Sequence, residues 1–268
     1  NISYAKNIDS TNFNEKNIYN YFSAQISLNN YKNIESLKFF NSSKFLKESH
    51  KPYIKKYLES LVLNGKIKKA IREIETTQNK KFTNFFEADL LLLLESIKNQ
   101  NYQKSNFYVN KLKDYKNQGT FEFVISSILE EYVYLFNNKK IKSSFEEHEF
   151  GTLTLINRAF QNCYLGTSNT DSYFKKIINF EEVDYSRYLF FYINYLLKEN
   201  NLEKVKNLLK DTDPLNSTLL VSQSKSWVNE KNIDNIKKIF SCKNPNDIIG
   251  EILFVISNLY SSEDYIYK

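Results

Sequence analysis

Apolar residues recur along the chain with the spacing of amphipathic helices. One such face lies between residues 54 and 61 and consists of Ile54, Tyr57, Leu58 and Leu61, at i, i+3, i+4 and i+7. This spacing matches the helical period of about 3.6 residues and predicts one buried face. Pro52 precedes the stripe and suits the first turn of a helix, where its missing N–H is no loss.

A second helix is predicted directly after a turn. Asn64-Gly65 ends the first helix, since glycine accepts the left-handed backbone conformation that is common just past a helix end. A new apolar stripe follows at Ile67, Ala70, Ile71 and Ile74. The two stripes and the turn between them predict a helical hairpin.

The hairpin pattern recurs along the whole chain. Ser36 and Phe40 stand 34 residues before Ala70 and Ile74, after a helix around residues 21–24. Further pairs of helical stretches are predicted at 90–97 and 105–112, 121–136 and 143–150, 153–165 and 173–178, 189–197 and 202–209, and 219–228 and 233–240. Residues 250–260 predict one more first helix, and the sequence SSED at 261–264 is typical of a helix start.

The stretch NGKIKKAIREI carries a resemblance to a known family. Its residues Gly65, Ile67, Ala70 and Ile74 resemble the middle of the tetratricopeptide repeat, a helix–turn–helix unit about 34 residues long. Weaker matches to the same positions are Ser36/Phe40, Ser105/Val109 and Val205/Leu209. The order of units, which ends in NDIIGEILFVISNLY, also resembles bacterial tetratricopeptide-repeat proteins that are best represented in alphaproteobacteria.

This resemblance implies an all-α fold, an α-solenoid in which about seven repeats wind into a right-handed superhelix. The solenoid is expected to span residues 17–268, after an N-terminal tail of residues 1–16. A single hairpin cannot bury both of its apolar faces, so each unit needs neighbours on which to stack. In the family, the concave surface of the stack holds an extended peptide or a helix of a partner.

By resemblance, the chain is expected to be a non-enzymatic protein-binding scaffold that needs no cofactor. The positions carried over to the concave face are Tyr21, Gln25, Lys55, Glu59, Leu90, Leu94, Leu129, Val133, Phe190 and Asn194. A competing interpretation of the four aliphatic positions 90, 94, 129 and 133 is packing inside the same solenoid. Lys55 and Asn194 hint at a carboxylate clamp, which we do not favour because they lie on separate repeats. The alternative function is that of a structural subunit buried permanently in a larger assembly, such as one at the cell envelope.

Composition agrees with a helical chain and argues against nucleic-acid binding. The five glycines and three prolines leave few tight turns. The net charge of +6 comes from 37 basic and 31 acidic residues that are interspersed, whereas a nucleic-acid protein concentrates its basic residues on one stripe. The 20 tyrosines and 21 phenylalanines fall mostly at helical core spacing, as in YSRYLFFYINYLL, so packing explains them without a ligand.

No pattern of catalytic or metal-ligating residues stands out. His148 lies among Glu146, Glu147 and Glu149, but adjacent helical residues point in different directions. Ser143 or Ser144 with a glutamate three residues later predicts a capping box there instead. His50 precedes a helix start and is expected to be a solvated loop residue.

The two cysteines and the chain start bear on the compartment. Cys163 is expected in the core and Cys242 could be exposed; a bridge between them is possible, but two cysteines do not make a disulfide framework. No apolar run approaches the roughly 18 residues that span a bilayer. The chain starts at Asn1 without any methionine, which we interpret as a processed product that is also shortened at its C-terminal end. An exported, periplasmic location is therefore slightly favoured over a cytoplasmic one.

Overall fold

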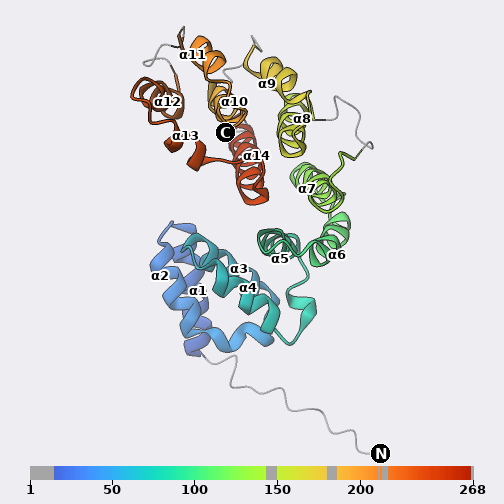
Figure 1. The fold of residues 1–268 in the computed structure, drawn as a ribbon. Coiled ribbons are helices and arrows are strands. Elements are labelled where there is room, and N and C mark those ends of the chain that lie inside the picture. The colour runs from blue at the N-terminus through green and yellow to red at the C-terminus, as the bar shows by residue number, and fades with distance from the viewer. Residues whose placement is uncertain (1–14, 143–149, 180–185, 211, 213–216, 267–268) are drawn as a thin grey trace, which may run out of the picture. The chain divides into compact units, whose positions relative to one another are not determined.

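The computed structural model describes residues 15–142, 150–179, 186–210, 212 and 217–266, and within these ranges the chain is helical without any strand. The predicted all-α class is confirmed. The α-helices are α1 Glu15–Asn29, α2 Asn33–Ser42, α3 Lys51–Leu63, α4 Ile67–Thr76, α5 Phe86–Lys98, α6 Tyr102–Lys113, α7 Thr120–Asn138, α8 Thr152–Leu165, α9 Thr170–Ile178, α10 Ser186–Lys198, α11 Leu202–Lys210, α12 Leu219–Asn229, α13 Ile233–Ile239 and α14 Pro245–Ile266 (Figure 1). Two 3-10 helices join them, η2 Lys44–Glu48 and η3 Lys80–Phe82.

The chain divides into two compact units, which we treat separately. Unit 1 ends at Glu95 and unit 2 begins at Ser96, so the division falls within α5. Within each unit, helices pack mainly on their neighbours in the sequence, such as α1 on α2, α3 on α4, α6 on α7 and α8 on α9. None of the helices within the described ranges is both long and apolar enough to cross a membrane.

The hairpin around Gly65 forms as the sequence predicts. Helix α3 starts with Pro52 in its first turn and ends at Leu63. Gly65 takes a left-handed conformation with φ of 69°, and its N–H donates to the Val62 carbonyl over 2.8 Å. The next N–H, of Lys66, reaches back to the Leu61 carbonyl, also over 2.8 Å. This pair of hydrogen bonds satisfies two carbonyls at the helix end and reverses the chain into α4.

The same left-handed turn recurs along the chain, mostly without glycine. Besides Gly65, the described residues with positive φ after a first helix are Tyr31, Gln100, Lys139, Gly166, Asn200 and Lys231. Tyr31 precedes Gly65 by 34 residues and Gly166 precedes Asn200 by 34 residues. A repeating turn therefore exists in the backbone itself, although glycine marks it in the sequence at only two of these positions.

The core of unit 1 is aromatic. Tyr53 and Tyr57 on α3 are fully buried against Phe40 of α2, and Tyr21 of α1 packs edge-on against Phe40. The buried hydroxyl of Tyr53 donates to the Phe40 carbonyl over 2.7 Å. The predicted small/large pairs of the repeat, Ser36/Phe40, Ala70/Ile74, Ser105/Val109 and Val205/Leu209, are all buried.

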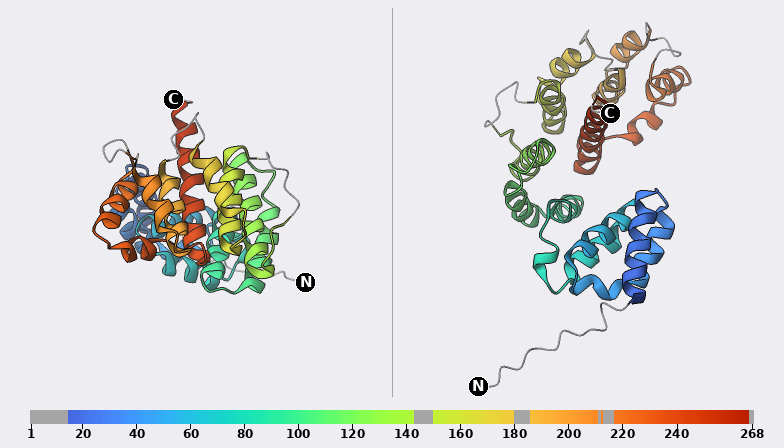
Figure 2. Two further views of the ribbon diagram at one scale, coloured as in Figure 1. Left: turned by 45° about the horizontal axis from the view of Figure 1, so that its top comes forward. Right: turned by 180° about the vertical axis from the view of Figure 1, so that it is seen from behind.

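Unit 2 is closed by its last helix and by a disulfide. Helix α14 lies beside α10 in Figure 1 and in both views of Figure 2, where it is drawn in red. Arg187 of α10 forms two hydrogen bonds with Glu251 of α14, over 2.8 and 2.7 Å, and its guanidinium lies 4.3 Å from the centre of the Phe254 ring. Cys163 of α8 is bonded to Cys242, which precedes α14. Cys242 is buried, so the expectation that it could be exposed is wrong.

Helix α14 also corrects the prediction for the end of the chain. It begins at Pro245 and runs without a break to Ile266, so residues 261–264 do not start a new helix. The sequence SSED lacked a preceding turn, and without one the helix continues through it. The predicted second helix at 143–150 and the tail at 1–14 lie outside the described residues, except Phe150; α1 begins at Glu15.

Candidate functional site

An apolar groove lies in unit 1 between α3 and α5. It has a volume of about 300 Å³. Its lining comprises Lys55, Leu58, Glu59, Val62 and Leu63 from α3, Phe85, and Glu87, Ala88, Leu90, Leu91 and Leu94 from α5. Leu90, Leu91 and Leu94 are half-buried, and the Leu63 side chain at the end of α3 is 52% exposed.

Helix spacing explains why these side chains meet. On α3, Lys55, Glu59 and Leu63 follow one another at intervals of four and share one face. On α5, Leu90 and Leu94 are also four apart. The run of five leucines is too apolar to hide every side chain on one face, and Leu92 and Leu93 take the buried side. The remaining leucines are left at the groove.

Charged side chains bridge the rim of this groove. The Lys55 ammonium lies 2.9 Å from a carboxylate oxygen of Glu87, which joins α3 to α5, and 5.5 Å from the centre of the Phe85 ring. Lys56 and Glu59 form a second pair, over 2.8 Å along α3. Exposed pairs of this kind contribute little to stability, about 0–1 kcal/mol. They are therefore available to exchange partners with an incoming chain.

Four of the ten predicted binding residues meet in this groove, namely Lys55, Glu59, Leu90 and Leu94. Gln25 is half-buried on α1 and is not part of the lining. The sequence reasoning missed Val62, Leu63, Phe85 and Leu91. Extending the predicted α3 face by one turn beyond Glu59 would have found the first two.

The other five predicted binding residues are core residues, and their assignment to an open surface is corrected. They are Tyr21, Leu129, Val133, Phe190 and Asn194, all of which are buried. The Asn194 amide is already committed, because it donates to the Ile236 carbonyl over 2.8 Å. Lys55 is engaged with Glu87. The two residues of the disfavoured carboxylate clamp thus both have other partners.

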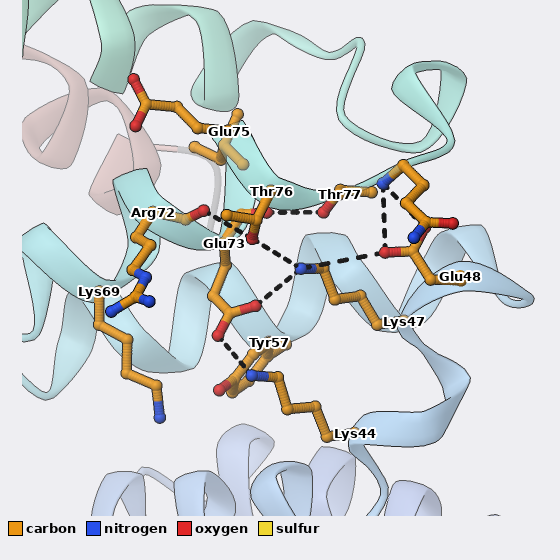
Figure 3. A network of polar contacts seen from close by, with 12 residues as sticks. Lys44, Lys47, Glu48, Tyr57, Lys69, Arg72, Glu73, Glu75, Thr76 and Thr77 are labelled. Atoms are coloured by element: carbon orange, nitrogen blue, oxygen red, sulfur yellow. Dashed lines mark hydrogen bonds and ion pairs between the residues drawn. The ribbon is translucent and has the colours of Figure 1, made fainter.

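A buried polar network lies at the opposite end of α4 from its turn (Figure 3). The Glu73 carboxylate accepts hydrogen bonds from Lys44 over 2.7 Å and from Lys47 over 2.9 Å, both on η2. The Lys47 ammonium also donates to the Thr76 hydroxyl over 3.1 Å. Burial alone would raise the pKa of Glu73, but the hydrogen bonds and charges of the two lysines lower it.

This network is built for holding the chain rather than for chemistry. Glu48, beside Lys47, accepts backbone hydrogen bonds from Gln78 over 3.0 Å and from Asn79 over 3.2 Å. Helix η2 is therefore fastened to the chain that leaves α4. Because the groups of the cluster satisfy one another, it offers neither a free base nor an open ligand position.

Other candidate chemistry is accounted for by structure. Both cysteines form the disulfide, so neither is a free nucleophile. His50 is half-buried rather than solvated; its ring lies 5.0 Å from that of Tyr21, and burial lowers its pKa. His148 lies outside the described residues, and within them no group of histidine, cysteine and carboxylate side chains could hold a metal ion.

The aromatic run that could have served as a stacking platform is mostly core. Tyr188, Phe190, Phe191 and Tyr192 of α10 are buried. Phe191 packs against Phe240, with ring centres 4.6 Å apart. Packing thus occupies these rings.

Comparison with known proteins adds no assignment. No family model matches the chain, and neither the curated proteins nor the solved structures give a significant match.

Proposed function

We propose that the protein is a non-enzymatic scaffold, a solenoid of about seven tetratricopeptide-like hairpins that binds a segment of a protein partner. Two observations support the solenoid. The left-handed turn recurs near 34-residue intervals, and first helices of successive hairpins pack on one another, as α1 does on α3 and α10 on α12. A stack of this kind leaves continuous faces open to a partner.

The α3–α5 groove is the proposed docking site. The observation that carries this proposal is the row of half-buried leucines, Leu90, Leu91 and Leu94, facing the exposed Leu63. A groove of about 300 Å³ is small for a cofactor but suits a few apolar side chains. An amphipathic helix presents such side chains at i, i+3, i+4 and i+7.

The rim charges set the register of the partner. Lys55 and Glu87 sit at the groove with opposite signs, and Glu59 adds a second carboxylate on the α3 side. A bound helix with both a basic and an acidic residue beside its apolar stripe would exchange these surface pairs for intermolecular ones. Apolar contacts supply the affinity and the charges select the orientation.

A displayed library of helical peptides tests the groove without knowledge of the partner. Peptides selected on the whole protein are expected to carry leucine-like residues at helical spacing. They should lose at least tenfold in affinity for Leu63→Glu, whose side chain is half-exposed and can be changed without unfolding α3. Leu219→Glu is the matched control, since Leu219 is 74% exposed and lies outside the groove.

The result separates this proposal from other surfaces. Peptides that bind wild type and Leu63→Glu equally well, or that respond only to Leu219→Glu, would place recognition elsewhere. A library that yields no helical-spacing motif would contradict helix-in-groove binding altogether.

An exported location is also proposed. The Cys163–Cys242 disulfide supports it, because such bonds persist in oxidising compartments and are rare in the cytosol. Fractionation of the native organism, with thiol alkylation before lysis, checks it. A protein recovered from the cytoplasmic fraction with both cysteines alkylated would refute the proposal.

A further inference from the structure

Helix α1 in unit 1 is amphipathic in the reverse sense. Its outward side carries Ile18, Tyr19, Phe22 and Ile26, which are between 39% and 67% exposed and which we call the α1 stripe. Its buried side includes the polar residues Asn17, Asn20 and Ser27. A helix at the end of a stack normally turns a polar face to water. The α1 stripe instead exposes four large apolar side chains on one helix, which is typical of an interaction surface.

The surroundings of the stripe are free of charge. Between Lys16 and Lys32 the chain contains no charged residue. Two copies of α1 could therefore approach each other without bringing like charges together and without removing a charge from water. A surface meant to stay solvated would carry such charges.

The order of the stripe is symmetric about Phe22. Ile18 stands four residues before it and Ile26 four residues after it, on one face of the helix. In an antiparallel pair of helices centred there, Phe22 meets its own copy and Ile18 meets Ile26. The same register brings Tyr19 opposite Gln25, and a phenol and an amide can share a hydrogen bond. A patch that complements itself under a two-fold rotation is the requirement for an isologous dimer.

We propose that the α1 stripe is a self-association surface, on which α1 of a second copy of this chain packs antiparallel with Phe22 at the two-fold axis. The face of one 15-residue helix is smaller than the roughly 800 Å² per partner of a stable complex. The dimer is accordingly reversible and depends on concentration. This inference shares no residue with the α3–α5 groove and does not depend on it.

Sedimentation velocity over a concentration series tests the association. Wild type is expected to shift from monomer to dimer as concentration rises, and Phe22→Glu is expected to stay monomeric with an unchanged circular dichroism spectrum. Phe107→Glu on α6 is the matched control, because Phe107 is 57% exposed and Phe22 is 56% exposed. Wild type that stays monomeric throughout, or a dimer lost equally in both variants, overturns the proposal.

Cysteine cross-linking tests the geometry. Under mild oxidation Phe22→Cys should form a covalent dimer by itself. Ile18→Cys should not do so alone, but should cross-link when it is mixed with Ile26→Cys. Efficient cross-linking of Ile18→Cys with itself would indicate a parallel pair and contradict the antiparallel arrangement. A mixture of wild type with any other apolar helix of the protein partner is not needed for either readout.

Discussion

Lys47 and Glu73 form an ion pair over 2.9 Å in which both side chains are removed from water, with only 10% and 7% of their surfaces exposed. The pair connects η2 to α4, so it joins the chain that follows the first hairpin to the second helix of the next. Removing one member of a buried pair leaves an uncompensated charge, whose cost exceeds that of losing an exposed pair.

Glu73→Gln is therefore expected to destabilise unit 1 by about 3 kcal/mol, measured by urea unfolding. Lys44→Met removes the other lysine from the same carboxylate, but the Lys44 side chain is 47% exposed. This control is expected to cost no more than about 1 kcal/mol. Equal losses from the two variants would show that burial does not govern the network.

Acid should weaken unit 2 in a window set by Asp171. Burial alone would raise the pKa of Asp171, but hydrogen bonds from Lys204, Tyr192 and Lys175 lower it to about 2, from an ordinary value of 3.8. Since the unfolded chain then binds the proton more readily, this contribution to the free energy of unfolding is complete above the ordinary pKa and is lost as pH falls toward 2.

Asp171→Asn should accordingly flatten the decline of stability between about pH 4 and pH 2, as followed by thermal unfolding across that range. Glu203→Gln serves as the control, because that side chain is 83% exposed. A decline that stays equally steep in Asp171→Asn would mean that other carboxylates dominate acid unfolding.

Reduction of the disulfide should destabilise unit 2 alone. Cys163 and Cys242 are 79 residues apart in the sequence. Closing a loop of that length removes unfolded-state entropy equivalent to roughly 4 kcal/mol. Calorimetry with a reductant should lower the melting transition of unit 2, while unit 1, which contains neither cysteine, keeps its own. The double variant Cys163→Ser/Cys242→Ser should melt at the same temperature with and without reductant.

The left-handed turns predict substitutions of opposite sign. Gly65 has no neighbouring atom within 4 Å of an added Cβ, so Gly65→Ala tests backbone strain alone and should cost about 1–2 kcal/mol. Tyr31 occupies the equivalent turn with φ of 58° and a side chain that is 90% exposed. Tyr31→Gly relieves the strain there and should raise the unfolding free energy, or leave it level once glycine's added chain entropy is offset. A large loss in Tyr31→Gly would show that the tyrosine side chain, rather than the backbone, matters at that turn.

The residues moved from the predicted surface to the core should behave as core. Tyr21→Ala and Phe190→Ala are each expected to lose about 3–5 kcal/mol, since a large buried ring leaves a cavity. Leu63→Ala, at the exposed edge of the groove, should change the unfolding free energy far less. Circular dichroism during urea titration distinguishes these outcomes, and a mild effect for Phe190→Ala would contradict its placement.

The helices were predictable because their signals are local. The α3–α4 hairpin follows from Pro52, the Asn64-Gly65 turn and two apolar stripes, and all three features act within a few residues. The remaining turns could be predicted only from their spacing, since tyrosine or lysine at φ near 58° gives no local sign of a reversal.

Burial of a helix face depends on what packs against it, which a single helix cannot report. Leu90 and Leu129 occupy similar apolar runs, yet Leu90 lines a groove and Leu129 is fully buried. Likewise, Cys242 looked like a residue past a helix end, and its bond to Cys163 depends on the return of the chain toward α8. The buried set in unit 2 was out of reach for the same reason.

The disulfide also changes what a cut in the chain would do. Residues 163 to 242 form a covalent ring that carries α9, α10, α11, α12 and α13. A protease that cleaves one peptide bond inside this ring opens it without dividing the protein into separate molecules. Fragments would part only after reduction, so a nicked protein could keep its mass and its hold on a partner while its backbone is already broken.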